Sequence, residues 1–236
     1  MKKQIMLLAI VLGGVFSMQA QEIEGTQSQS QRTITEQPRK VTDWSEQPIG
    51  IVYGGIGVGH IISAEEGAAR TGVDWRIGMS RYYNQWGWGV LLQQLTAWQN
   101  TYISNSQQTV KMKDTNRLLY LAPQFTARKM LGKQLTMYGA IGWGWLHYKE
   151  AVNLEGFGQF NAKANALGGN ISVGIEYRLG KRAGLSVDAG LIEGKIGKPK
   201  VNNAVLQEVI DEAYTGKMNA SRLFATVGVH IYIWKH

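Results

Sequence analysis

A two-residue alternation of apolar and polar side chains is the feature that most constrains the fold of this chain. In the segment Asn170–Leu179 the odd positions are apolar or amphipathic, and the even positions are polar or small. Successive side chains of a β-strand point to opposite faces, so this segment predicts a strand with one apolar and one polar face. The alternation recurs and predicts eight strands, over about residues 49–60, 71–82, 86–98, 116–128, 134–148, 170–179, 184–193 and 221–234.

The first 48 residues have a different composition. Lys2 and Lys3 precede an apolar run and a small-residue site ending at Ala20, which is the order of a secretory signal peptide over residues 1–20. The apolar run is shorter than the ~20 residues of a membrane-spanning helix, so we predict cleavage rather than an anchor. Residues 21–48 are rich in Gln, Ser, Thr and charge, and we predict a disordered periplasmic segment that acts as a spacer or binds a partner.

The predicted connections alternate between short and long. Those after the second, fourth and sixth strands are short, whereas residues 61–70, 99–115, 149–164 and 194–220 form long connections. Outer-membrane barrels have short periplasmic turns and longer outer loops. We therefore predict an all-β fold: an eight-stranded antiparallel up-and-down transmembrane β-barrel over residues 49–236, in the outer membrane of a Gram-negative cell.

Local features refine this prediction. Glycine makes up 29 of the 236 residues and is concentrated inside the alternating segments, where it marks bulges, bends or close backbone approach. The apolar positions change parity across Gly54-Gly55, which predicts a β-bulge. Pro123 cannot donate to a neighbouring strand, so it should occupy a bulge or a locally unpaired position. Residues Val205–Ala213 have the spacing of a short amphipathic helix.

Aromatic residues gather near the predicted strand ends. Membrane barrels carry aromatic girdles at both membrane surfaces, although aromatic residues also favour strands in general. The predicted topology places one girdle near the periplasmic rim and one near the outer rim: Trp86, Trp88, Phe125 and Tyr177 in the first, and Trp75, Trp143 and Trp145 in the second.

The polar faces of the strands would line the barrel interior. An eight-stranded barrel is just wide enough to be filled by side chains, and unpaired buried charges are costly. We therefore predict a salt-bridged interior network that closes the lumen; a gated proton or ion path is the alternative use of the same residues. The predicted network consists of Asp74, Arg76, Glu176, Arg178, Asp188 and His230.

Charge and composition bound the partners. The chain has a formal charge of +8 and no Cys, which excludes disulfides and a lipid anchor at the cleavage site. Outer-membrane lipid and lipopolysaccharide are the expected counter-charge, and nucleic acid is not an expected partner of an exported protein. We expect no metal and no cofactor, because no ligand-spaced His pair or acidic calcium loop is present. We expect a monomer that contacts any protein partner through its outer loops or residues 21–48.

Two other functions are compatible with an exported barrel. A lipid-modifying enzyme would need a nucleophile and a base near the outer rim, where His60, His147, Ser63 and Glu65 are expected, but no Gly-x-Ser-x-Gly elbow supports it. We therefore predict a non-enzymatic protein with a structural or surface-interaction role. A soluble, lipocalin-like ligand-binding barrel would instead point its apolar faces inward and its polar faces outward.

With the strands placed, the chain resembles the small outer-membrane barrels of OmpA- and OmpX-like architecture, and in particular the barrel-domain family common in Bacteroidota. The resemblance covers about residues 49–236. It is carried by Tyr120–Pro123, Met137–Gly144, Gly174–Leu179 and the alternating end Val227–Ile233. The family includes structural, adhesive, secretion-associated and conjugation-associated members, so the resemblance implies a membrane barrel without selecting among these roles.

Overall fold

The computed structural model describes residues 47–62, 70–104, 109–154, 158–202, 207 and 218–234. The chain divides into two units, residues 1–42 and 43–236, and all the described residues belong to the second. The predicted signal peptide, nearly all of the segment 21–48, and the predicted helix Val205–Ala213 except Gln207 therefore lie outside the described residues. Within the described part, no helix is long and apolar enough to cross a membrane.

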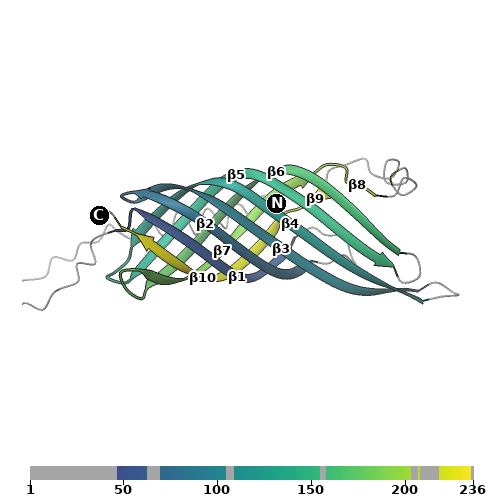
Figure 1. Ribbon diagram of the computed structural model, residues 1–236, viewed down its shortest axis with the longest axis horizontal. Helices are drawn as coiled ribbons and strands as arrows, with labels where there is room; N and C mark the ends of the chain where they lie inside the picture. The colour runs from purple at the N-terminus through teal and green to yellow at the C-terminus, as the bar shows by residue number, and fades with distance from the viewer. Residues whose placement is uncertain are drawn as a thin grey trace, which may run out of the picture. The chain divides into compact units, whose positions relative to one another are not determined.

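Eight long antiparallel strands form a closed ring, as the sequence predicts (Figure 1). The ring order is β1-β2-β3-β4-β5-β6-β7-β10, and β10 closes it by pairing with β1. Two short strands, β8 and β9, pair with β6 and β7. The strands are β1 Gly50–Ile61, β2 Thr71–Tyr83, β3 Trp86–Ser104, β4 Thr109–Met130, β5 Leu135–Leu154, β6 Gly158–Arg178, β7 Ala183–Ile196, β8 Lys200–Val201, β9 Met218–Asn219 and β10 Arg222–Ile233.

The strands are staggered around the ring. Register partners followed once around the barrel from Gly50 lead back to β1 at His60, which is a stagger of ten residues. A stagger of this kind requires the strands to tilt against the barrel axis, as Figure 1 shows. Closure leaves no unpaired edge within the ring, so each strand there has a partner on both sides. Beyond the ring, residues 98–104 of β3 pair only with β4, and residues 158–167 of β6 pair with β5 and, at two positions, with β8.

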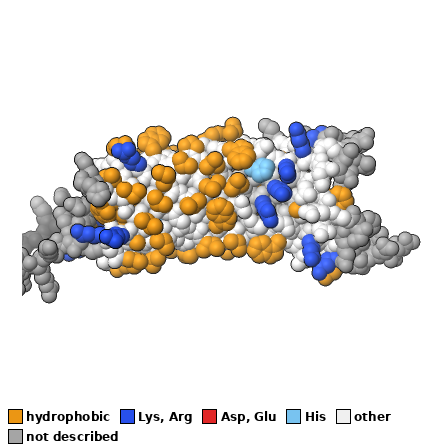
Figure 2. Space-filling view, in the orientation of Figure 1, with side chains coloured by type: hydrophobic (Ala, Val, Ile, Leu, Met, Phe, Trp, Pro, Cys, Tyr) orange, Lys and Arg blue, Asp and Glu red, His pale blue; other side chains and the backbone are white. Residues whose placement is uncertain are grey.

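The outer face of the ring is predominantly apolar, and the charged residues of the predicted network point into the barrel. On β6, Ile175 and Tyr177 are exposed, whereas Glu176 and Arg178 are buried. Figure 2 shows the resulting hydrophobic band, bordered at both ends by Lys and Arg. Each long strand contributes exposed apolar residues, among them Ile56, Ile77, Val90, Leu121, Ile141, Ile175, Val187 and Val229. This orientation contradicts the lipocalin-like alternative, which needs a polar outer face.

The predicted alternation of short and long connections holds except at two of the predicted loops. Three connections are short, namely residues 84–85, 131–134 and 179–182, and Asn84 takes the left-handed conformation (φ 62°) of a tight hairpin. At the other end of the barrel, the predicted loops 99–115 and 149–164 are mostly strand, because β3 to β6 continue well beyond their predicted ends. The side chains there are largely polar on both faces, so the alternation that revealed the other strands is missing.

The ladders test two local predictions. The predicted bulge at Gly54-Gly55 is wrong, because the register of β1 with β2 and β10 continues unbroken through both residues. The parity change arises because Ile51 and Tyr53 point into the barrel, where Ile51 is buried. The prediction for Pro123 is confirmed: the β4–β5 ladder is interrupted between Leu121 and Gln124, although β4 stays paired with β3 there.

Candidate functional site

The six residues of the predicted network, from β2, β6, β7 and β10, are all buried in the barrel interior. They form three small groups, each containing at least one carboxylate. In the first group, Nδ1 of His230 lies 2.5 Å from Oε2 of Glu176, and the hydroxyl of Tyr232 donates to Oε1 at 2.7 Å. Nε of Arg178 lies 3.9 Å from the same Oε1. Opposite charges therefore compensate one another within this group.

The second group is centred on Asp188. Arg76 pairs with it at 2.5 Å, the hydroxyl of Tyr138 donates to it, and Ser186 donates at 3.3 Å. The guanidinium of Arg76 also lies 5.3 Å from the ring centre of Tyr53, within cation–π range. The carboxylate and the guanidinium are both almost completely shielded from solvent.

The third group joins Asp74 to residues that sequence reasoning missed. Gln93 donates to Asp74 at 2.7 Å, and Nε of Arg222 lies 3.7 Å from its other oxygen. Arg222 is fully buried and also donates to the backbone oxygen of Leu118 at 2.7 Å. Arg128 was missed as well; it lies over the Tyr82 ring at 4.3 Å. Both arginines occupy inward positions by strand parity, which is the signal that could have identified them.

Two interior tyrosines lie over glycines of the neighbouring strand. Tyr53 is the register partner of Gly78, and Tyr138 is the partner of Gly174. A Cβ atom at Gly78 would lie 2.3 Å from the Tyr53 hydroxyl, and one at Gly174 would lie 2.5 Å from Tyr138 Cζ. These glycines therefore provide the space in which each tyrosine ring lies against the neighbouring strand.

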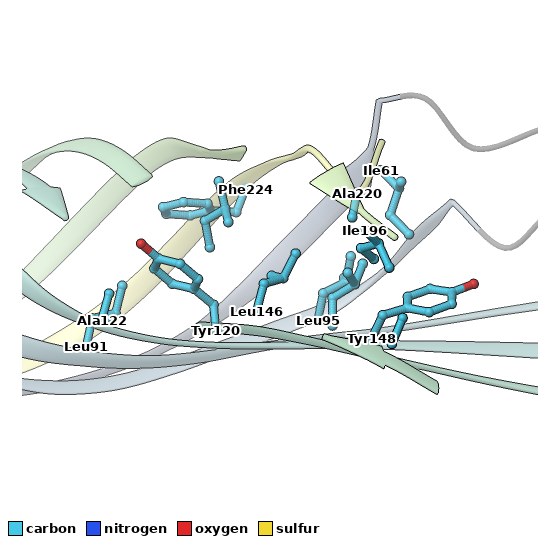
Figure 3. Close-up of a cluster of buried hydrophobic side chains, with 13 residues drawn as sticks. Ile61, Leu91, Leu95, Tyr120, Ala122, Leu146, Tyr148, Ile196, Ala220 and Phe224 are labelled. Atoms are coloured by element: carbon cyan, nitrogen blue, oxygen red, sulfur yellow. The ribbon is translucent and has the colours of Figure 1, made fainter. Parts of the chain in front are cut away.

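An apolar cluster fills the interior beyond the Glu176 and Asp188 groups and beside the Asp74–Arg222 pair, and the sequence analysis did not predict it (Figure 3). Leucines from β3, β4 and β5 meet Ile192 of β7 and Phe224 of β10 across the lumen. Tyr120 lies in the same cluster and donates to Asn170 at 3.1 Å. The described members are Ile61, Leu91, Leu95, Leu118, Tyr120, Ala122, Leu146, Tyr148, Ala164, Ile192, Ile196, Ala220 and Phe224.

The seven residues predicted as girdles all lie on outward positions of the barrel. Trp86 and Trp88 flank Phe125, with ring centres 5.4 and 5.1 Å away, near the short-turn end. Tyr177 is exposed at the same end and donates to Gln134 at 2.8 Å. Trp75, Trp143 and Trp145 lie on β2 and β5, and the last two are exposed.

The outward face of β4, β5 and β6 changes character over three successive rows of register partners. The first row is apolar, with Leu121, Trp145 and Leu167. The second holds Leu119, His147 and Asn165, and the third is cationic, with Arg117, Lys149 and Lys163; β8 extends this third row by Lys200. His147 stacks on Trp145 at 5.3 Å and pairs with Asn165 at 2.8 Å. The hydrophobic band therefore ends within two side-chain positions.

The structure describes two of the four residues that the enzymatic alternative would use. His60 lies on β1, exposed, with its Nδ1 2.8 Å from the hydroxyl of Thr71. His147 lies on β5 and has an amide oxygen as its partner. Ser63 and Glu65 lie outside the described residues. Among the described residues no group of three or more His, Asp or Glu side chains is placed to hold a metal.

These features define a class: a closed, eight-stranded antiparallel barrel with an apolar outer face and a filled interior. No protein-family model matches the chain, and no curated protein matches it. One similar solved structure is Neisserial surface protein A, with 17% identity and a TM-score of 0.48 over 78% of this chain and 97% of that one. Another is OprG of Pseudomonas aeruginosa, with 10% identity and a TM-score of 0.49 over 79% of this chain and 96% of that one. The Yersinia pestis attachment invasion locus protein Ail is also similar, with 13% identity and a TM-score of 0.41 over 77% of this chain and 97% of that one. These identities are too low to indicate a shared function.

Proposed function

We propose that this chain is an integral outer-membrane barrel without enzymatic activity, whose lumen is closed by side chains and whose extended hairpins act at the cell surface. The observation that carries the proposal is the continuous apolar outer face around all eight long strands. Soluble monomers rarely expose apolar patches of this extent. Hydrocarbon accommodates such a face when the backbone hydrogen bonds are satisfied internally, as they are in a closed barrel.

The two ends of the barrel suggest its orientation. The short turns, the start of β1 and the end of β10 lie at one end, which we assign to the periplasm, as in known outer-membrane barrels. The extensions of β3 to β6 then project outward from the cell. Their largely polar side chains suit a structural or partner-contacting role in water.

The filled interior supports a barrier rather than a pore. Apolar side chains from seven strands meet across the lumen, with the Asp74–Arg222 pair beside them, and the Glu176 and Asp188 groups form a second layer. An ion crossing this interior would have to displace both layers. We therefore infer no steady conductance, and we assign the charged groups a packing role.

Fractionation and gel mobility test the proposal. The outer-membrane fraction is run on an SDS gel with and without heating, with a soluble periplasmic protein as the control. A protein that remains with the membrane and migrates faster unheated supports a closed integral barrel, whereas recovery in the soluble periplasm refutes it.

The purified barrel should give no steady current in a planar lipid bilayer. Replacing His60 and His147 together with Ala should leave the cell's lipid A profile unchanged; an altered profile would support the enzyme alternative.

A further inference from the structure

Four cations lie side by side on the outside of the barrel. Arg117 on β4 is the register partner of Lys149 on β5, which is the partner of Lys163 on β6, which in turn is the partner of Lys200 on β8. Neighbouring strands are about 4.8 Å apart, so this cationic row spans roughly 14 Å. Like charges directly opposite each other destabilise a sheet. A bound anion would relieve this repulsion along the whole row.

The described part of the chain offers the row no counter-charge. None of its four members forms an ion pair with a described acidic side chain. Three of the cations are exposed and Lys149 is half-buried. A groove of about 730 Å³ lies over Lys149, Lys163 and Lys200 and is also lined by His147 and Lys198. Arg117 lines an adjoining hollow of about 230 Å³, which Lys149 also lines. The cations are therefore accessible in a hollow large enough for a headgroup.

The position of the row relative to the hydrophobic band indicates the ligand. It lies two side-chain positions beyond the Trp145 row, where aromatic residues give way to polar ones. The next row outward is neutral, with Thr115, Ala151 and Asn161. Figure 2 shows Lys and Arg gathered at this border of the band, beside a histidine. Four adjacent cations at the edge of an apolar face match the level of lipid headgroups. The outward cations farther along β4, Lys113 and Lys111, are separated from this row by the neutral row.

We propose that the row Arg117–Lys149–Lys163–Lys200 binds the phosphate groups of an anionic glycolipid in the outer leaflet, of the lipid A class. The inference rests on the proposed function, because it requires the apolar band to lie in the membrane. Lys supplies point charges to phosphate oxygens, and Arg117 can donate two hydrogen bonds to one phosphate. The acyl chains of the bound lipid lie along the exposed Trp145 and Leu167.

Native mass spectrometry of the full chain in dodecylmaltoside micelles tests this site. The probes are diphosphorylated hexa-acyl lipid A and the same lipid with both phosphates removed. Changing all four cations of the row to Gln should weaken binding of the phosphorylated lipid by at least about 100-fold, since each surface cation contributes roughly fivefold and the four contributions multiply. The dephosphorylated lipid should bind the wild-type barrel as weakly as it binds this variant. Raising the salt to about 0.5 M should weaken the wild-type complex as well.

A matched control removes four exposed cations at the opposite end: Arg81, Lys133, Lys181 and Arg182, each changed to Gln. Its affinity should stay within about twofold of wild type. Unchanged affinity in the row variant, equal binding of both lipids, or an equal loss in the control would each overturn the site. If the row variant loses its heat-dependent mobility, the pair Lys149→Gln and Lys163→Gln replaces it, with a loss of at least about threefold expected. A barrel that stays in the membrane but fails these tests refutes this site alone, whereas a soluble barrel refutes the proposed function.

Discussion

Replacing Asp188 with Asn should destabilise the barrel by about 3 kcal/mol. The substitution preserves the size of the side chain and leaves an oxygen to accept from Tyr138. It removes the charge that lies 2.5 Å from Arg76, a guanidinium with only 6% of its side chain exposed. Removing one partner of a buried ion pair usually costs about 3–5 kcal/mol, because the remaining charge is left uncompensated. We expect the lower end of this range, since Arg76 keeps its cation–π contact with Tyr53.

Equilibrium unfolding in urea measures this loss, with the barrel in phosphatidylcholine vesicles and tryptophan fluorescence as the signal. Glu193→Gln is the matched control, because Glu193 is exposed on the outward face of β7 and should change stability by less than about 0.5 kcal/mol. Adding Arg76→Met to Asp188→Asn should restore at least about 1 kcal/mol by removing the stranded cation. If Asp188→Asn costs less than about 1 kcal/mol, or if Arg76→Met deepens the loss, Arg76 is solvated and the account of a filled lumen is wrong.

Three further substitutions probe the outer face, the tyrosine–glycine pairs and the apolar cluster. Val187→Arg places a charge on the lipid-facing side of β7 and should cost about 2–4 kcal/mol in vesicles, a penalty that should largely disappear in detergent micelles. Gly174→Ala puts a Cβ atom 2.5 Å from Tyr138 and should cost about 1–3 kcal/mol by urea titration, and Tyr138→Ala in the same chain should relieve part of that loss. Leu95→Ala removes a fully buried member of the apolar cluster and should cost about 2–5 kcal/mol; a smaller cost would mean that water already occupies this level of the barrel.

The inside and outside faces of the barrel follow from the sequence because strand geometry allows only two directions for a side chain. Val187 and Asp188 are adjacent in the chain, yet one faces out and the other is buried against Arg76. A membrane barrel requires the apolar set to be the outer one, so parity within each segment was enough to place the predicted interior charges. Strand number and the antiparallel ring follow from the count of such segments and from the short turns between them.

Other features could not be predicted from the sequence because they show no two-residue alternation of apolar and polar side chains. The outer parts of β3 to β6 are largely polar on both sides, so they read as loops although they are paired within the β3–β4, β4–β5 and β5–β6 ladders. The apolar cluster is hidden in the same way, because Leu95 and Leu118 occupy inward positions where charge was expected. The bulge predicted at Gly54-Gly55 failed for the opposite reason. There, interior residues such as Ile51 are apolar, so the apolar positions change parity although the strand has no bulge.

The extended hairpins should be separable from the barrel that carries them. Asn100 and Lys113 are register partners near the outer part of the β3–β4 hairpin, so residues 101–112 can be replaced by the two-residue turn Asn-Gly. The ring, the ion-paired groups and the apolar cluster lie below this point, so stability in vesicles should change by less than about 1 kcal/mol and the heat-dependent gel shift should remain. Any adhesive or partner-binding property of intact cells should be lost, provided that the hairpin carries it. Failure of the shortened chain to assemble would instead show that the projecting strands are needed for folding, and would remove the main structural reason for assigning them a surface role.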